Sequence, residues 1–316
     1  MFVVAIHGGA GLSTPEDLGP EREAQARKDL EQSLLAAHNI LQNGGTAMDA
    51  VVAAVEVMEN SPMFNAGTGS VLASDGRCYM DASIMNGETG EAGALCLSTT
   101  IKNPIKAARC IMENTPYVMI VGDRLKDLAE EYSLECIDNS AFVTQYRKDQ
   151  LVEAKAANTI ILDHEKANQG KDPNKGKGPK GTVGAVALDG FGNLAAATST
   201  GGLCNKDPGR VGDSAIIGGG TYAKNSTCAI SATGHGELFI RSNVAGRMSA
   251  LMEFAGKNLQ EAADVVIMQE LPEDIGGLIS VDAHGNVALP FNTGGMFRGV
   301  IRDDGQAHVA VWHGED

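Results

Sequence analysis

Thr182 stands at a point in this sequence where an ordinary hydroxyl could become a nucleophile. It follows Gly181, which ends a stretch at 168–181 without apolar side chains, and it begins the β-rich run TVGAVAL at 182–188. A threonine hydroxyl reacts only beside a base, and a threonine that starts a chain can use its own α-amine, whose pKa is about 8. Cleavage between Gly181 and Thr182 would create such a residue. The simpler interpretation is a β-branched residue that opens a strand.

Arg210 and Asp213 could together bind an amino acid. They lie three residues apart in the glycine-rich turn GRVGD at 209–213. A guanidinium pairs bidentately with a carboxylate, and a carboxylate accepts hydrogen bonds from an ammonium group. The pair therefore matches the α-carboxylate and α-ammonium of an amino acid, although a salt bridge within a surface turn explains the same two residues.

Thr233, Gly234 and Gly236 belong to the segment TGHGE at 233–237, which follows an expected strand and opens an expected helix. A hydroxyl with backbone N–H groups at a helix N-terminus suits an oxyanion hole, and ordinary capping is the alternative. Thr200 ends the run LAAATST at 194–200, and pairing of this run with 182–188 would bring its hydroxyl to Thr182.

Other chemistries lack their sequence patterns. The chain has no G-x-S-x-G, no H-E-x-x-H and no metal-ligand spacing among its seven histidines, so we expect no serine triad, no catalytic metal and no cofactor. A net charge of −15 disfavours nucleic acids and anionic membranes as partners. Six scattered cysteines, with neither a leader nor an apolar span, predict a cytoplasmic protein with free thiols.

The elements that position these residues come in blocks of strands and of helices, which predicts an α+β fold. The segment DGFGN at 189–193 predicts a hairpin between 182–188 and 194–200. We also expect a flexible linker over 168–181. The remaining elements used below are helices over 21–42, 46–58 and 236–254 and a strand over 69–79.

Taken together, these segments resemble the plant-type (type III) asparaginases, the isoaspartyl peptidase/L-asparaginases of the N-terminal nucleophile hydrolase superfamily. The resemblance covers nearly the whole chain. It rests on HGGAG at 7–11, FNAGTG at 64–69, MDASIM at 80–85, NPIKAAR at 103–109, GTVGAVALD at 181–189, ATSTGG at 197–202, GRVGDS at 209–214 and TGHGE at 233–237.

This resemblance implies one domain over 1–316, a four-layer αββα sandwich of the N-terminal nucleophile hydrolase type. It implies self-cleavage between Gly181 and Thr182 into an alpha chain 1–181 and a beta chain 182–316, and a dimer of such heterodimers. Thr182 matches the family's nucleophile and Thr200 the threonine beside it. The other matches are Arg210 and Asp213 for the substrate's α-groups, Thr233 and Gly234 for the oxyanion, with Gly236 in the same substrate-binding loop.

The family also holds a structural sodium ion on backbone carbonyls of the loop at about 58–68. The corresponding ligands here are Met58, Glu59, Ser61, Phe64, Ala66 and Thr68.

The expected activity is hydrolysis of L-asparagine and of β-aspartyl dipeptides through a β-aspartyl-enzyme. A glycosylasparaginase-like amidohydrolase is the enzymatic alternative, although that branch usually has Asp where this chain has Gly181. An uncleaved, inactive relative that serves as an acidic binding protein is an alternative of a different class.

Overall fold

The computed structural model describes residues 1–12, 14–157, 160 and 181–315, and its strands form two sheets. Of the expected linker at 168–181, residues 168–180 lie outside the described ones. The large sheet contains, in spatial order, β12 (Ala307–Trp312), β11 (Gly295–Arg302), β1 (Val3–Leu12), β5 (Thr182–Leu188), β6 (Leu194–Thr200), β2 (Met80–Asn86), β3 (Ala92–Ser98) and β4 (Met119–Val121). The small sheet contains β10 (Val287–Ala288), β9 (Gly276–Asp282), β8 (Cys228–Gly234) and β7 (Thr221–Ala223).

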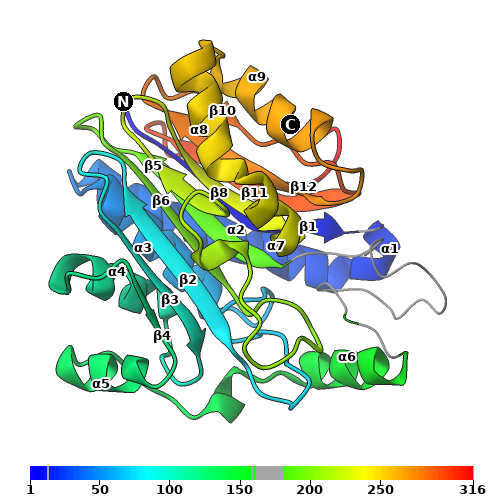
Figure 1. Ribbon diagram of the computed structural model, residues 1–316. Helices are drawn as coiled ribbons and strands as arrows, with labels where there is room; N and C mark the ends of the chain where they lie inside the picture. Colours follow the sequence, from blue (N-terminus) through cyan, green and yellow to red (C-terminus); the bar gives the residue numbers. More distant parts are fainter. Residues whose placement is uncertain (13, 158–159, 161–180, 316) are drawn as a thin grey trace.

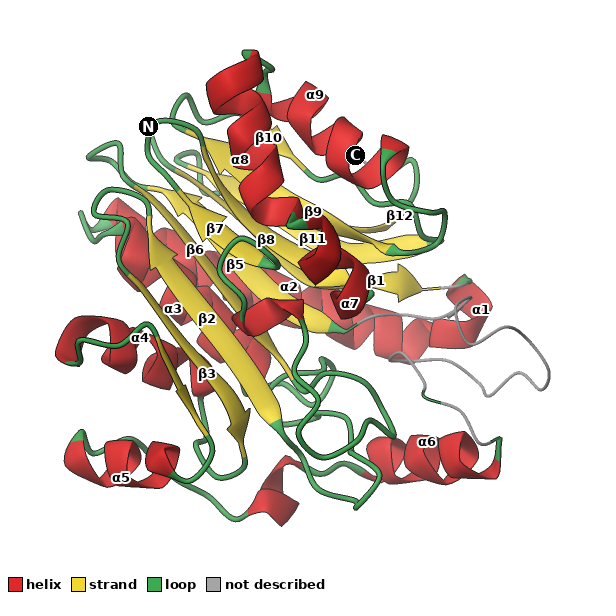
Figure 2. Ribbon diagram, in the orientation of Figure 1, coloured by secondary structure: helices red, strands yellow, loops and turns green. Residues whose placement is uncertain are grey.

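Helices complete the fold. They are α1 (Pro15–Leu18), α2 (Pro20–Gln42), α3 (Ala47–Glu59), α4 (Pro104–Asn114), α5 (Arg124–Glu131), α6 (Gln145–Ala156), α7 (Gly236–Ser242), α8 (Val244–Ala255) and α9 (Leu259–Asp264). Several of them, chiefly α2, α3, α4, α8 and α9, cover the outer faces of the two sheets. Figures 1 and 2 place α2 and α3 behind the large sheet, and α8 and α9 over the small one. Within the described residues, no helix is both long and apolar enough to cross a bilayer.

Three apolar clusters hold these layers together, because alternate residues of a strand point to opposite faces. Val183 and Ala185 of β5 point to the cluster under α2, α3 and α4. Val186 points the other way, into a cluster with Ile279 of β9 that fills the space between the sheets. The third cluster joins the small sheet to α8 and α9. The fold is therefore a mixed α+β arrangement of two facing sheets flanked by helices, as the sequence predicts at this level.

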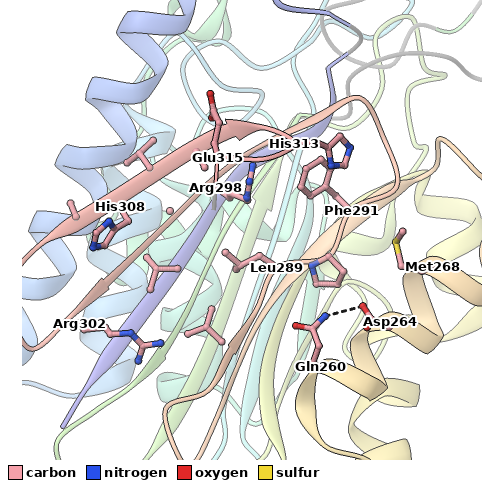
Figure 3. A pocket seen from close by; sticks show the side chains of 17 residues that line it. Gln260, Asp264, Met268, Leu289, Phe291, Arg298, Arg302, His308, His313 and Glu315 are labelled. Carbon is pink, nitrogen blue, oxygen red and sulfur yellow. Dashed lines mark hydrogen bonds between the residues drawn. The ribbon is translucent and has the colours of Figure 1, made fainter.

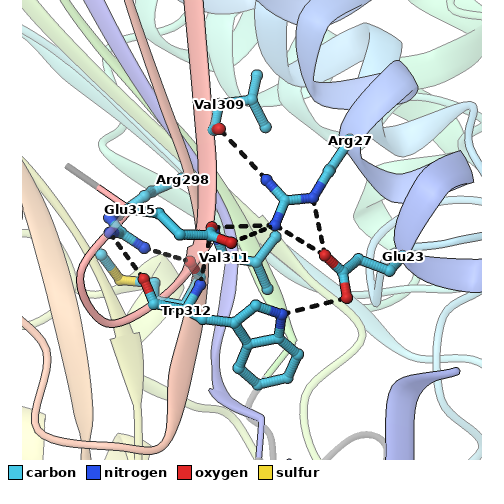
Figure 4. A network of polar contacts seen from close by, with 8 residues as sticks. Glu23, Arg27, Arg298, Val309, Val311, Trp312 and Glu315 are labelled. Atoms are coloured by element: carbon cyan, nitrogen blue, oxygen red, sulfur yellow. Dashed lines mark hydrogen bonds and ion pairs between the residues drawn. The ribbon is translucent and has the colours of Figure 1, made fainter. Parts of the chain in front are cut away.

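A polar network fastens α2 to the edge strand β12. Arg27 bridges Glu23 and Glu315 at 2.7 and 2.8 Å, and the Trp312 indole N–H donates to Glu23 (3.1 Å; Figure 4). Glu315 also accepts the N–H of Val311 at 2.7 Å. This network keeps the outer end of the large sheet in place against its helix layer.

The hairpin that carries Thr182 forms as predicted. Asp189 closes the turn by accepting the N–H groups of Phe191 and Asn193, each at 2.9 Å. The two strands then pair in continuous register from Leu188 opposite Leu194 to Thr182 opposite Thr200. The predicted helices 21–42 and 46–58 also form, the second with a complete capping box at Thr46.

Two predicted elements were wrong. Residues 69–79 form turns instead of a strand, because their backbone bonds to neighbouring loops, as where the Gly69 N–H donates to the Phe142 carbonyl (2.8 Å). The helix expected over 236–254 is two helices, because Asn243 adopts a left-handed φ of 48° between α7 and α8. The strands β2, β7 and β11 and the helices α1 and α6 have no counterpart in the sequence-based prediction.

Candidate active site

Thr182 and Thr200 face each other at the end of the β5–β6 hairpin. The Thr182 hydroxyl donates to the Thr200 hydroxyl at 3.1 Å, and both side chains are buried. Thr200 in turn accepts the N–H of Gly202 at 3.0 Å. Thr198, two residues earlier on the same face, contacts Ser231 of β8 at 2.7 Å, so this face points between the two sheets. The hairpin register alone therefore brings the two hydroxyls together.

A small pocket lies at this hairpin end. Gly181, Thr182 and Thr200 line one side of it, and Arg210 and Asp213 line another. The remaining lining residues are Gly202, Leu203, Ser214 and Gly234. The pocket joins the two separate sequence segments that could carry a nucleophile and an amino-acid grip.

His7 lies beneath Thr182, in the strand that pairs with β5. Its Nε2 is 2.9 Å from the Ser231 hydroxyl, and its ring is fully buried. Burial lowers the pKa of His7 from 6.5 to about 3, and a contact with the Thr182 backbone opposes this shift only in part. A Cβ on Gly184 would collide with both the His7 ring and the Ser231 hydroxyl. Glycine at 184 therefore leaves room for a neutral histidine that braces the Thr182 strand.

Arg210 is held in the pocket by an ion pair. Its Nε and Nη2 donate to the two carboxylate oxygens of Glu237, each at 3.0 Å. Arg210 and the neighbouring His235 together lower the pKa of Glu237 against the opposing effect of burial. A Cβ on Gly236 would lie 2.8 Å from Arg210 Nη2 and 3.0 Å from Asp213 Oδ1. Gly236 thus lets the guanidinium and the carboxylate approach one another over the backbone.

Thr233 and Gly234 end β8 next to this group. The Thr233 hydroxyl accepts the N–H of Ala10 at 3.3 Å, which ties it to β1. Gly234 lines the pocket itself, and Phe239 packs so closely over it that a Cβ would not fit. Gly234 therefore brings the end of β8 to the pocket, and Thr233 is the residue directly before it.

Six of the expected site residues thus line one pocket: Gly181, Thr182, Thr200, Arg210, Asp213 and Gly234. Gly236 lies against Arg210 and Asp213, and Thr233 precedes Gly234 in β8. Several partners of these residues have no sequence signal of their own. Glu237 could have been suspected from its place beside TGH. His7 and Ser231 are 224 positions apart, and only the fold brings them together.

The loop after α3 offers carbonyl oxygens where the sodium ligands are expected. The carbonyl oxygen of Glu59 lies against Gly67, and those of Pro62 and Phe64 lie 2.7 and 2.8 Å from where a Cβ on Gly69 would stand. Neutral oxygens are the ligands that hard cations take, so the residues present fit such an ion. In the described parts of the chain, no three His, Cys, Asp or Glu side chains gather as a metal site.

A much larger cavity lies elsewhere. It measures about 920 Å³ and is lined by residues of β10, β11, β12 and α9 and of the segments beside them, among which are Arg298, His308 and His313 (Figure 3). It shares no lining residue with the pocket at Thr182. Size alone therefore does not identify the candidate active site, which is recognised by its chemistry.

The chain belongs to the asparaginase family, whose sequence model matches residues 1–311. The resemblance deduced from the motifs is confirmed. The chain is 44% identical over 298 residues to the isoaspartyl peptidase of Salmonella typhimurium, covering 94% of each protein, and 44% identical to that of Escherichia coli, covering 94% of this chain and 91% of the relative. It is 39% identical over 315 residues to the isoaspartyl peptidase/L-asparaginase of Bos taurus, covering 99% and 97%.

Proposed function

We propose that this chain is an isoaspartyl peptidase/L-asparaginase that first cleaves itself before Thr182. The observation that carries the proposal is the pair of hydroxyls at Thr182 and Thr200, 3.1 Å apart, in a pocket that also contains Gly181, Arg210 and Asp213. The nucleophile, the bond that it would cleave and the residues that would bind the amino-acid groups of the substrate then lie in one pocket.

In the first reaction, Thr182 Oγ attacks the carbonyl carbon of Gly181. The C–N bond to Thr182 breaks, the nitrogen takes the hydroxyl proton, and an ester joins Gly181 to the Thr182 side chain. Water opens this ester, which leaves a carboxylate on Gly181 and a free α-amine on Thr182. The products are an alpha chain 1–181 and a beta chain 182–316 of the same domain.

In the second reaction, the free amine of Thr182 accepts the proton of its own hydroxyl while the oxygen attacks the side-chain carbonyl of the substrate. The Thr233 hydroxyl and the Gly234 N–H stabilise the oxyanion. The amine passes its proton to the leaving ammonia or amino acid, and a β-aspartyl ester remains. Water then attacks this ester by the same route and releases aspartate.

Arg210 and Asp213 define which substrates enter. Arg210 would bind the α-carboxylate, and Asp213 the α-ammonium group, of an aspartyl head. L-asparagine and β-aspartyl dipeptides present both groups freely, whereas an internal residue of an ordinary peptide presents neither. Gly236 contributes by leaving room for both side chains.

Gly181 is part of the pocket wall in the uncut chain. The space there measures only about 10 Å³, too little for an amino acid and barely enough for one water. Because Gly181 is part of the lining, its departure after cleavage would enlarge the pocket. Cleavage would therefore both free the amine and open the substrate site.

The wider organisation follows the same family. The two facing sheets and their helices suit the four-layer αββα sandwich of the N-terminal nucleophile hydrolases, and the assembly would be a dimer of alpha–beta heterodimers. The carbonyls at 58–68 would hold a sodium ion that stabilises their loop, with no part in the reaction. The cytoplasmic location stays a prediction; all six cysteines are free thiols.

The decisive experiment is intact mass analysis with N-terminal sequencing of the purified protein. The parent chain is expected to give two polypeptides, the smaller beginning Thr-Val-Gly-Ala, and Thr182→Ala one polypeptide of 32.9 kDa. A Thr182→Ala chain that still splits before residue 182 refutes the mechanism. An uncut parent would favour an inactive binding protein.

Substrate assignment is tested separately. Arg210→Ala should raise KM for a β-aspartyl dipeptide at least tenfold while self-cleavage proceeds, because the first reaction needs no carboxylate grip. An unchanged KM removes Arg210 from the substrate site. Release of aspartate from a glycosylated asparagine, but not from L-asparagine, would instead favour the glycosylasparaginase alternative.

A further inference from the structure

Lys206 is a fully buried lysine close to the proposed substrate pocket. Its side chain has 0% exposure, and its Nζ donates to the Tyr79 carbonyl at 2.8 Å. Lysine is among the residues least often buried, because an ammonium loses its hydration inside a protein. Burial accordingly lowers the pKa of Lys206, and the negative charge of Asp81 opposes this effect. Such a costly placement calls for a role in the site.

Asp81 lies on β2. Burial raises the pKa of its carboxyl group, and the positive charge of Lys206 opposes this effect. Asp81 is fully buried directly opposite Thr200 in the sheet register. Its Oδ1 accepts the N–H of Leu97 at 2.9 Å, where Leu97 adopts a left-handed φ of 61°. This backbone is unfavourable for a leucine, so the hydrogen bond to Asp81 helps to fix it. The side chain of Asp81 is therefore fixed on the sheet, and the charge of Lys206, which lies on a loop, acts on it.

That loop is the one that carries the proposed carboxylate grip. Gly202, which lines the pocket, adopts a φ of 81° with Lys206 Nζ so near that a Cβ would lie 2.6 Å from it. Arg210 lies four residues further on, and its charge and that of Lys206 act on each other. Asp81 interacts with Lys206, with Arg210 and with the Gly212 backbone. The buried ammonium of Lys206 thus lies close to Gly202, at the start of the segment 202–212 that contributes to the pocket wall.

We propose that Lys206, balanced by Asp81, is a specificity-determining residue that favours substrates with a free α-carboxylate. Its ammonium lies behind Gly202 and adds a second positive charge to the side of the pocket where Arg210 stands, in surroundings with little water to screen it. Arg210 would bind the substrate directly. Lys206 would act without touching the substrate, because its positive charge attracts the α-carboxylate and because its side chain positions the loop at 202–212. The inference rests on the proposed function, since it assigns Arg210 to the α-carboxylate.

The test is the variant Lys206→Met, which keeps the length and apolar stem of the side chain and removes its charge. Steady-state kinetics would compare a β-aspartyl dipeptide with the same dipeptide whose aspartyl α-carboxylate is an amide. We expect KM for the free carboxylate to rise about tenfold, with kcat within threefold and self-cleavage as in the parent. The ratio of kcat/KM between the two substrates should fall about tenfold. Lys28→Met, which removes an exposed lysine from α2, is the matched control and should leave this ratio unchanged.

A second variant protects the test against misfolding. Asp81→Asn retains the acceptor for the Leu97 N–H and removes the opposing negative charge, so the ratio should move the other way, in favour of the free carboxylate. If Lys206 and Asp81 had a merely structural role, each substitution would change kcat/KM by the same factor for the two substrates. An unchanged ratio in Lys206→Met, or a shift of the same sign in both variants, overturns the inference.

Binding of L-aspartate separates this inference from the proposed function. Calorimetry on the parent and on Lys206→Met should give a Kd about ten times higher for the variant, without any catalysis. An active parent whose affinity for aspartate is unaffected by Lys206→Met refutes the inference alone. A parent that neither reacts nor binds aspartate refutes the proposed function and the inference with it.

Discussion

The neutral, buried His7 makes the stability of this protein depend on pH in a defined window. In the folded chain burial lowers its pKa to about 3, whereas an unfolded chain has the ordinary value of 6.5. Between these values the unfolded state binds a proton that the folded state does not, so stability falls as pH falls through the window. At pH 7.5 almost the full stability is present. At pH 5.5 the loss from this one residue is about 1.4 kcal/mol.

The measurement compares two chains that differ only at residue 7. Both carry Thr182→Ala, so that each unfolds as one polypeptide, and one also carries His7→Gln, whose amide can still reach Ser231. Urea unfolding at pH 7.5 and at pH 5.5 gives the loss of stability for each. Other histidines and carboxylates titrate alike in both chains, and their contributions cancel in the comparison.

We expect the chain that retains His7 to lose about 1.4 kcal/mol more than the His7→Gln chain between these two pH values. The exposed His308 supplies the control, since His308→Gln in the same background should leave the larger loss unchanged. Equal losses with and without His7 would contradict the view that a neutral imidazole braces the Thr182 strand.

Three further substitutions test the site at separate points. Thr200→Val should lower kcat about 100-fold, because it removes the hydroxyl bonded to Thr182, and steady-state assays should find activity largely restored in Thr200→Ser. Gly236→Ala should raise KM about tenfold with self-cleavage intact, since the added Cβ displaces Arg210; an unaltered KM contradicts the crowding seen there. Gly184→Ala should cost about 3 kcal/mol in urea unfolding, because its Cβ meets two buried polar groups, and a loss below about 0.5 kcal/mol would mean that the strand shifts freely.

Sequence reasoning succeeded where a local pattern determines the structure. The turn residues at 189–193 fix the hairpin, and the hairpin register alone places Thr200 against Thr182. The capping box at Thr46 likewise fixes the start of α3. For the site, all the residues that line the pocket except Leu203 belong to the motifs, because glycine-rich turns bring their neighbours close to it.

The sequence-based predictions failed where contacts between distant residues determine the local structure. Residues 69–79 look β-rich, but they bond to loops such as the one at Asn205, whose N–H donates to the Leu72 carbonyl (2.8 Å). Glu237 faces Arg210 across 27 positions, and Lys206 reaches Tyr79 across 127. No periodicity in the sequence encodes such pairs, so they become visible only in three dimensions.

The order of strands in the large sheet has a consequence for how the molecule can be made. β1 lies between β11 and β5, so under the proposed cleavage a strand of the alpha chain is hydrogen-bonded on both sides to the beta chain. If two genes encoded the halves separately, the beta chain would lack the strand between β11 and β5. The alpha chain would carry β1 with both of its edges unpaired, and such edges promote aggregation. If the proposed cleavage takes place, the uncut chain would serve as its own assembly template, and the cut would be tolerated only after the sheet has closed.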